Sequence, residues 1–378
     1  MTTPEKVIRE DVRSIAAYHV PGAEGMVKLD AMENPYGLPD ELRREIAALA
    51  ACAPINRYPD PGALALKARL RSAMQIPEGF DILLGNGSDE IIQIVVLASA
   101  RAGAVIMAPE PTFVVYRMAA GAANVRFVGV PLEADFALDP ERFLAAMTEH
   151  KPSVVFLAYP NNPSGNLFPE EAVVRILAAA PGLVVIDEAY HAFAGRTFMG
   201  LLERWPNLLV MRTVSKLGLA GLRLGYAVAR PGWMREFEKL RLPYNIGVLT
   251  QRLGERLLAH HGVLEAQAAA IRTERAHLAS RLARVAGVTP FPSDANFILL
   301  RVPDARRVFE GLKRRNVLVK NLHGSHALLE NCLRVTVGTA QENLQFIAAL
   351  EAALAENRAN RVVLGADRCH LPPCANHK

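Results

Sequence analysis

Cysteine is scarce in this sequence, since 378 residues include only Cys52, Cys332, Cys369 and Cys374. So few and such scattered cysteines do not form the disulfide framework that small secreted domains use. We therefore expect a cytoplasmic protein, because its thiols suit a reducing compartment.

Long apolar runs are also missing. The mostly apolar run from Ile91 to Ala100 is much shorter than the roughly 20 residues that cross a bilayer. The first six residues carry charge and contain no apolar segment of the kind found in signal peptides. We expect no membrane partner.

Excess charge is small over most of the chain. Of the formal net charge of +5, residues 358–378 contribute +3, which leaves +2 for residues 1–357. A nearly neutral body argues against binding of nucleic acid. The tail holds two cysteines and two histidines between Cys369 and His377, but their spacing matches no zinc module. We predict a disordered tail over 358–378 and no metal site.

What the sequence does have is a regular alternation of apolar strands and helical stretches, with 51% hydrophobic residues. Continuous apolar strands between helices predict an α/β fold whose mostly parallel sheet is flanked by helices. The predicted strands of this sheet cover 82–84, 104–107, 154–157, 183–187, 208–212 and 222–228.

From about residue 250 the pattern predicts a second, smaller α/β unit. A long helical stretch over 250–285 comes first and is rich in alanine, arginine and leucine. Further strands are predicted over 296–300, 317–320 and 333–337, with helices over 304–315 and 341–356. We predict a large domain over 42–248 and a small domain formed by 1–41 and 249–357.

Two residues at strand ends carry the main chemical prediction. Lys216 ends an apolar run and precedes a glycine-rich turn, where its amine can reach a cofactor aldehyde. Asp187 ends another apolar strand, where its carboxylate can hold a proton on a pyridine nitrogen. A lysine and an aspartate in these roles are the protein's part of pyridoxal-phosphate (PLP) chemistry. Taken singly, each also fits a solvated loop or a turn.

The turn from Gly85 to Asp89 lies between a strand and a helix and suits a phosphate, although an ordinary tight turn has the same composition. The third glycine of a dinucleotide-binding fingerprint is replaced by Glu90, which argues against a nicotinamide dehydrogenase.

Other candidates have two interpretations each. Phe113 can stack on a cofactor ring or fill the core. Asn162 can donate to a phenolate or only shape a turn. Ser215 and Arg223 can bind a phosphate dianion. Arg334, flanked by strand formers, can clamp a carboxylate or form a structural salt bridge.

The ordered set of motifs resembles the fold-type I, PLP-dependent aminotransferases of classes I and II over nearly all of residues 1–357. Within that group the chain resembles the histidinol-phosphate aminotransferases. The motifs are Met32-Glu-Asn-Pro-Tyr36, Arg57-Tyr-Pro-Asp-Pro61, Gly87-Ser-Asp-Glu90, Pro111-Thr-Phe113, Asn161-Asn-Pro-Ser-Gly165, Asp187-Glu-Ala-Tyr190, Ser215-Lys216, Gly218-Leu-Ala-Gly-Leu-Arg223 and Asn331-Cys-Leu-Arg-Val-Thr-Val-Gly338.

The resemblance implies a role for each residue around the PLP ring. Lys216 forms the Schiff base and later moves a proton, and Asp187 pairs with the pyridine nitrogen. Tyr190 and Asn162 contact the ring's phenolic oxygen, and Phe113 stacks on the ring.

The resemblance also assigns the phosphate and the substrate. The backbone at Ser88 and Asp89, together with Ser215 and Arg223, holds the phosphate. Tyr58 reaches the cofactor phosphate of the neighbouring subunit, which implies a homodimer. The residues implied on the substrate side are Arg334, Tyr18, Asn34 and Lys320.

Two departures from the family pattern stand out. Lys216 and Arg223 are seven residues apart, whereas eight is usual, so we expect a tighter loop with Arg223 in the same role. Lys320 stands where many relatives have arginine, and a lysine lacks the bidentate fork.

The implied reaction transfers an amino group between L-histidinol phosphate and 2-oxoglutarate, giving imidazole-acetol phosphate and L-glutamate. Three alternatives stay open: an aromatic or broad-specificity aminotransferase, a threonine-phosphate decarboxylase, and a PLP-binding regulator. The last is disfavoured because only about 30 residues precede Glu33, too few for a DNA-binding domain ahead of the fold.

Overall fold

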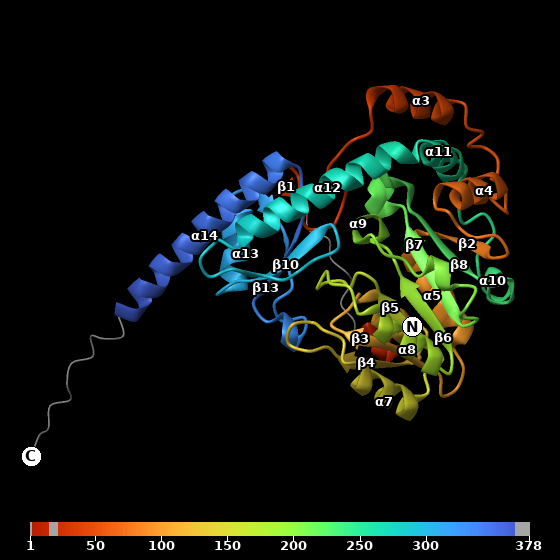
Figure 1. The fold of residues 1–378 in the computed structure, drawn as a ribbon, viewed down its shortest axis with the longest axis horizontal. Coiled ribbons are helices and arrows are strands. Elements are labelled where there is room, and N and C mark those ends of the chain that lie inside the picture. Colours follow the sequence, from red (N-terminus) through yellow and green to blue (C-terminus); the bar gives the residue numbers. More distant parts are fainter. Residues whose placement is uncertain (1, 15–21, 367–378) are drawn as a thin grey trace, which may run out of the picture.

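The computed structural model describes residues 2–14 and 22–366, and its largest element is a seven-stranded sheet (Figure 1). The strand order is β2-β8-β7-β6-β5-β3-β4. Strand β8 runs antiparallel to both of its neighbours, whereas the strands from β7 to β4 are parallel. The strands are β2 (Asp81–Asn86), β3 (Val105–Glu110), β4 (Arg126–Pro131), β5 (Val154–Ala158), β6 (Leu183–Asp187), β7 (Leu208–Thr213) and β8 (Leu224–Ala229).

Helices cover both faces of this sheet, and this is why the central strands are continuous apolar runs. Every residue of β5, β6, β7 and β8 is buried. One face packs against α5 (Gly87–Ser99), α6 (Val115–Ala122) and α10 (Pro231–Glu238). The other face packs against α4 (Leu64–Ala73), α7 (Pro140–His150), α8 (Glu170–Ala179) and α9 (His191–Ala194).

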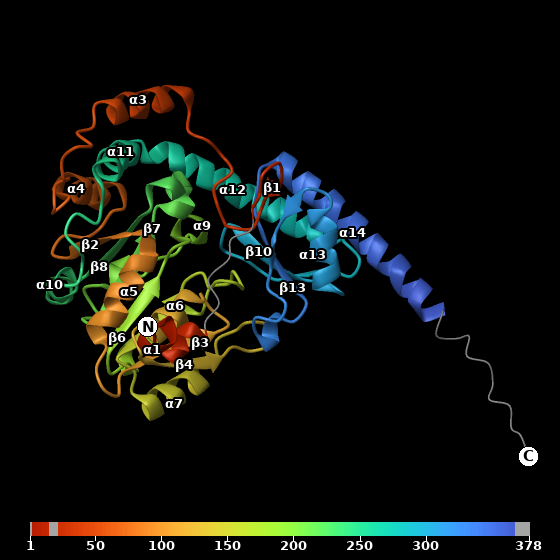
Figure 2. The same cartoon turned by 180° about the vertical axis from the view of Figure 1, so that it is seen from behind.

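A smaller unit lies beside the large sheet (Figures 1 and 2). Its four-stranded antiparallel sheet has the order β12-β13-β10-β9, and β1 pairs in parallel with β11. The strands are β1 (Val27–Lys28), β9 (Thr289–Pro290), β10 (Phe297–Arg301), β11 (Val317–Leu318), β12 (Lys320–Asn321) and β13 (Cys332–Thr336).

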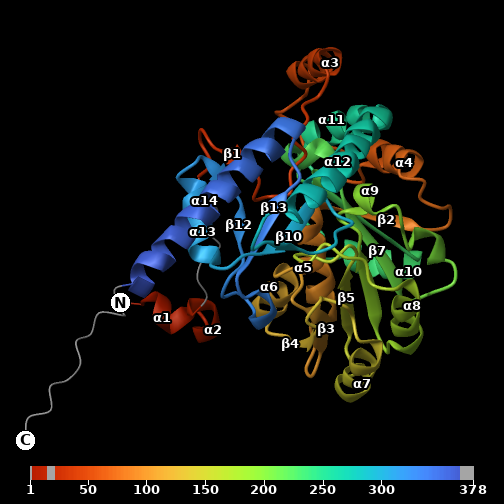
Figure 3. The same cartoon turned by 60° about the vertical axis from the view of Figure 1, so that its left-hand side comes forward.

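The remaining helices frame these two sheets (Figure 3). In the described residues, α12 spans the two units, because it contacts α9 of the large unit and both α14 and β10 of the small one. The helices are α1 (Pro4–Val7), α2 (Glu10–Arg13), α3 (Asp40–Ala51), α11 (Val248–Ala259), α12 (His261–Leu282), α13 (Ala305–Lys313) and α14 (Ala340–Ala366).

The fold class predicted from the sequence is confirmed, with differences in detail. The predicted helix over 250–285 is wrong as one element, because the chain breaks at His260 between α11 and α12. The last strand of the large sheet begins at Leu224, since 220–222 form a short 3₁₀ turn. Helix α14 continues past the predicted boundary at residue 357 to Ala366. Over the residues described, no helix is long and apolar enough to cross a membrane.

Candidate active site

One cavity lies at the carboxyl ends of the central strands, where ligands bind in open α/β sheets. Nine of the residues singled out from the sequence line it, although they come from six separate segments of the chain. These are Ser88, Asp89, Phe113, Asn162, Asp187, Tyr190, Ser215, Lys216 and Arg223.

Lys216 lies in a five-residue turn, Ser215–Leu219, directly after β7. Its Nζ donates a hydrogen bond to the Ala31 carbonyl at 2.9 Å. Burial, together with the positive charge of Arg334, lowers the pKa of Lys216 to about 8. Since only a neutral amine is a nucleophile, this environment gives Lys216 a reactive fraction near neutral pH.

Asn34 supports the turn that carries Lys216. Its Nδ2 donates to the Leu217 carbonyl at 3.1 Å and to Gln267 Oε1 at 3.0 Å. Gly218 has φ 129°, and a Cβ there would lie 2.9 Å from Asn34 Nδ2. Both the conformation and this close approach therefore require glycine. Asn34 does not line the cavity, so its structural contacts differ from the substrate role that the resemblance implied.

Asp187 ends β6 and is 3% exposed. Its Oδ2 accepts a hydrogen bond from the Tyr116 hydroxyl at 2.6 Å, and its Oδ1 accepts one from the Ala189 N–H at 3.1 Å. Burial raises the pKa of Asp187 to about 6, against the opposing effect of the Tyr116 hydrogen bond. At neutral pH the carboxylate is therefore charged and able to accept a proton donor in the cavity.

The N-terminus of α5 forms an anion cradle with Arg223. The N-cap residue of α5 makes no side-chain capping bond, and Ser88 and Asp89 of its first turn line the cavity. Arg223 forms an ion pair with Asp89 at 3.5 Å, and its carbonyl accepts from Gly87 N–H at 2.7 Å. A Cβ on Gly225 would lie 2.4 Å from Ser88 N, so glycine permits this close packing.

The seven-residue interval between Lys216 and Arg223 is accommodated by two short turns. The turn of Lys216 is followed by a 3₁₀ turn over 220–222, and Arg223 itself takes a left-handed conformation with φ 49°. The structure thus places both ends of the shortened loop at the same cavity.

A polar chain leads from Arg334 into the cavity. Arg334, on β13 and 7% exposed, donates to Asn162 Oδ1 at 2.6 Å and to the Asp30 carbonyl at 3.1 Å. The Nδ2 of Asn162 donates in turn to the Tyr190 hydroxyl at 3.2 Å. Arg334 belongs to the smaller sheet, and through Asn162 it contacts the wall of the cavity.

The other predicted residues lie elsewhere. Lys320 on β12 is the register partner of Arg334, and so it lies at the small-sheet side of the site. Tyr58 is 80% exposed and stacks on Tyr244, with ring centroids 4.4 Å apart, outside the cavity of its own chain. Tyr18 lies outside the described residues.

Comparisons with known proteins decide the family. The model of the family "Aminotransferase class I and II" matches residues 24–350.

The chain belongs to this family of aminotransferases.

Curated relatives narrow the likeness further. Histidinol-phosphate aminotransferase 2 of Cupriavidus pinatubonensis is 55% identical to this aminotransferase over 355 residues, which is 93% of this chain and 97% of that protein. Histidinol-phosphate aminotransferase 1 of Ralstonia nicotianae is 54% identical over 354 residues, or 92% and 95% of the two chains.

Among solved structures, the fold is similar to that of histidinol-phosphate aminotransferase from Sinorhizobium meliloti in complex with pyridoxal-5'-phosphate. The TM-score is 0.82 at 26% identity, over 92% of this chain and 97% of that one. The aminotransferase fold predicted from the motifs is confirmed.

Three further residues shape this aminotransferase site and were not predicted to do so from the sequence. Met32 and Thr213 line the cavity, and Tyr116 lies behind Asp187. Spacing gave no signal for Tyr116, because its role depends on a contact with Asp187, which is 71 residues further along the chain. Met32 opens a family motif, but its place at the cavity depends on the fold of the N-terminal segment over the site.

Metal chemistry finds no support in the described part of this aminotransferase. Over those residues, no group of three or more His, Cys, Asp or Glu side chains is placed to hold a metal ion. The cysteines and histidines between Cys369 and His377 lie outside the described residues.

Proposed function

We propose that this aminotransferase uses PLP to exchange an amino group between L-histidinol phosphate and 2-oxoglutarate, with imidazole-acetol phosphate and L-glutamate as the products. The observation that carries the proposal is that Lys216 and Asp187 line the same cavity. The names and high identity of the curated relatives support the substrate.

The residues present fit PLP group by group. The partly buried amine of Lys216 suits its aldehyde, and the carboxylate of Asp187 suits its ring nitrogen. The first turn of α5, which has no N-cap side-chain bond, and Arg223 suit its phosphate dianion. Gly225 leaves no room for a Cβ beside the Gly87 and Ser88 backbone, so β8 packs closely against the first turn of α5 and fixes its place at the cavity.

Bound PLP supplies an electron sink that weakens the bonds at the substrate Cα and carries the amino group between two substrates. Lys216 acts as general acid and base at that carbon, because its pKa of about 8 lies close to the working pH. Asp187 keeps a proton on the ring nitrogen, because its charged carboxylate is the acceptor there. Tyr190 and Asn162, which are joined by a hydrogen bond from the Asn162 amide to the Tyr190 hydroxyl, would contact the phenolic oxygen of the ring.

Arg334 binds the anionic group of each substrate. A guanidinium can take a carboxylate or a phosphate in a bidentate manner, which suits a site that receives glutamate and then a phosphorylated amine. Lys320, opposite Arg334 in the sheet, adds a second positive charge for the phosphate. The names of the curated relatives favour neither an aromatic aminotransferase nor a threonine-phosphate decarboxylase.

The substrate is tested by titrating the PLP-loaded protein with L-histidinol phosphate in the absence of a keto acid. We expect the visible absorbance of the bound cofactor to be replaced by the near-ultraviolet band of its aminated form. L-phenylalanine at the same concentration serves as the control and is expected to change the spectrum at least about tenfold more slowly, since it lacks the phosphate that Arg334 and Lys320 attract. Reaction with phenylalanine alone would replace the proposed substrate by an aromatic amino acid while leaving the cofactor in place.

A homodimer is the second part of the proposal. Five large apolar side chains are exposed on two adjoining segments, and we call them the Tyr58 patch. Its members are Ile55, Tyr58, Leu64, Leu242 and Tyr244, each at least 40% exposed. Apolar patches of this kind mark interaction sites. An isologous dimer across the patch offers Tyr58 to the phosphate in the partner's cavity.

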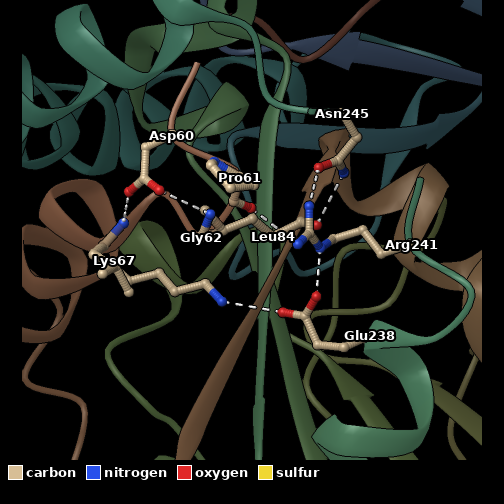
Figure 4. A network of polar contacts seen from close by, with 9 residues as sticks. Asp60, Pro61, Gly62, Lys67, Leu84, Glu238, Arg241 and Asn245 are labelled. Atoms are coloured by element: carbon tan, nitrogen blue, oxygen red, sulfur yellow. Dashed lines mark hydrogen bonds and ion pairs between the residues drawn. The ribbon is translucent and has the colours of Figure 1, made fainter. Parts of the chain in front are cut away.

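A polar network holds the two segments of the Tyr58 patch together (Figure 4). Arg241 donates to the Pro61 carbonyl at 3.1 Å, to Glu238 Oε2 at 2.6 Å and to Asn245 Oδ1 at 2.8 Å. Lys67 donates to the other oxygen of Glu238 at 3.1 Å. The patch is therefore fixed before any partner binds, which lowers the entropy cost of association.

Mixed dimers test whether Tyr58 acts across the interface. We expect Lys216→Ala and Tyr58→Ala proteins, each measured at limiting PLP, to gain activity when their subunits are exchanged. In a mixed dimer one site has both native residues if Tyr58 acts in trans, so about a quarter of all sites recover. The control is a mixture of two Lys216→Ala samples, one tagged, which should gain nothing. Activity equal to the mean of the separate variants would place Tyr58 outside the partner's site.

A further inference from the structure

Tyr116 is a buried tyrosine with an unusual set of neighbours. It lies in the first turn of α6 and is 0% exposed. Its hydroxyl donates to Asp187 Oδ2 at 2.6 Å, a short distance typical of a bond to a charged acceptor. Its ring packs edge-on against Phe113, with centroids 5.6 Å apart. Tyr116 does not line the cavity, but both of these neighbours do.

The two donors to Asp187 hold its carboxylate from different elements. The Ala189 N–H fixes Oδ1 from the chain just beyond β6, and Tyr116 fixes Oδ2 from α6. Each carboxylate oxygen has two lone pairs, so one further acceptor site on each oxygen is left for a donor in the cavity. With both oxygens bonded, rotation of the carboxylate is restricted.

The Tyr116 ring is itself held in place. It stacks on Phe156 of β5, with centroids 4.6 Å apart and an interplanar angle of 12°. A rigid aromatic ring packed on a central strand of the sheet gives the hydroxyl a fixed position, which a mobile or solvated donor does not have. Because the ring is fixed against the sheet, its hydroxyl holds the Asp187 carboxylate in one position.

We propose that Tyr116 is a positioning residue, whose hydroxyl orients Asp187 toward the ring nitrogen of the cofactor while its ring sets the position of Phe113. The proposal rests on the PLP cofactor of the proposed function. Tyr116 acts through Asp187 and Phe113 and touches no reacting atom.

The charges around Asp187 predict how removal of the Tyr116 hydroxyl changes the charge of this carboxylate as the pH falls. The titratable groups that act on Asp187 are Asp89 at the start of α5 and the adjoining Glu188, which favour its neutral form, and Tyr116, which favours its charged form. Tyr190 also interacts with it. Without the Tyr116 hydroxyl the pKa of Asp187 rises above about 6, so the charged acceptor is lost at a higher pH than in the native protein.

The test compares Tyr116→Phe with the native protein in the binding of two compounds to cofactor-free protein. One is PLP, and the other is the PLP analogue in which carbon replaces the ring nitrogen. We expect Tyr116→Phe to weaken the binding of PLP about tenfold, as for the loss of one charge-assisted hydrogen bond. The analogue offers Asp187 no donor, so its dissociation constant should change less than about twofold, within the tolerance for an uncoupled site.

Matched variants separate positioning from a general structural effect. Tyr226→Phe removes a hydroxyl from another tyrosine that is 0% exposed, and it should leave both dissociation constants unchanged. In an Asp187→Asn background, Tyr116→Phe should cause no further loss of PLP affinity, since the two residues act as a unit. The loss in the single variant should grow as pH falls from 8 to 6.

The outcomes are distinct. Equal weakening of PLP and its analogue, or no weakening of PLP, would overturn the role of Tyr116 while leaving the proposed function intact. A native protein that binds neither compound overturns the proposed function and this inference together. Tyr116→Phe is expected to fold, because phenylalanine fits the same aromatic stack and a carboxyl without its donor can take up a proton.

Discussion

Lys216→Ala is expected to reduce transamination by at least about 10⁴-fold and to remove the visible absorbance of bound cofactor. The loss of a single general acid–base group costs up to about 10⁴ in rate, and here the covalent partner of the cofactor is lost as well. The structure gives the reason for singling out this lysine, because it lines the cavity and its amine has a pKa of about 8.

The control for this prediction is Lys239→Ala. Lys239 is a surface lysine whose Nζ pairs with Glu236, far from the cavity lining, and exposed ion pairs contribute little to stability. Activity and absorbance should be unchanged in that variant. If Lys216→Ala kept both the absorbance and the turnover of the native protein, Lys216 would not be the residue that carries the chemistry.

Asp187→Asn is expected to lower activity strongly and, at the same time, to make the cofactor-free protein more stable at neutral pH. Burial raises the pKa of Asp187 from its usual 3.8 to about 6, so keeping it charged at pH 7 costs up to about 3 kcal/mol of folding free energy. Asparagine avoids this cost, and the Tyr116 hydroxyl can accept from its amide as well as donate.

The pH dependence gives this prediction a definite sign. In the native protein the folded state binds the Asp187 proton more tightly than the unfolded state does. The contribution of Asp187 to the free energy of unfolding is therefore fully favourable below pH 3.8, and it is lost as the pH rises through about 6. The difference in unfolding free energy between Asp187→Asn and native protein should be small near pH 4 and largest above pH 6, measured by urea unfolding of cofactor-free samples. A difference that is constant with pH would contradict the buried-carboxylate account.

Strand positions were predictable from the sequence because the strands are buried on both faces. The run over 183–187 was predicted to the residue, and 154–157 and 208–212 each fell one residue short of the end. Helix ends were harder, because the break at His260 between α11 and α12 has neither glycine nor proline at the break itself. The pairing of β1 with β11 was not predictable, since two-residue strands carry no periodic signal.

The site was predictable where one residue type is needed at a strand end, as for Lys216 and Asp187. It was less predictable where a side chain serves another side chain. Asn34 belongs to a motif of the family, but the structure shows it supporting the turn after Lys216. Tyr116 occupies a position that the sequence does not distinguish from an ordinary core residue, although its hydroxyl contacts Asp187. Such roles depend on contacts between distant segments, which spacing does not report.

The positions of the domain boundaries and the cytoplasmic location stay predictions, and so does disorder of the tail beyond Ala366, whereas 358–366 belong to helix α14. They concern the chain in solution and rest on the sequence alone. Most of the cavity lining comes from the large sheet, from the ends of β5, β6 and β7, the turns after them and the first turn of α5, and Met32 adds a contact from the N-terminal segment.

The most direct test of the central claim is to load native protein with PLP, reduce it with borohydride and map the modified peptide by mass spectrometry. We predict a single modified residue, Lys216, with the mass of a reduced phosphopyridoxyl group. The same treatment of Lys216→Ala should give no defined adduct. A stable adduct at a different lysine of the native protein, with Lys216 unmodified, would contradict the account.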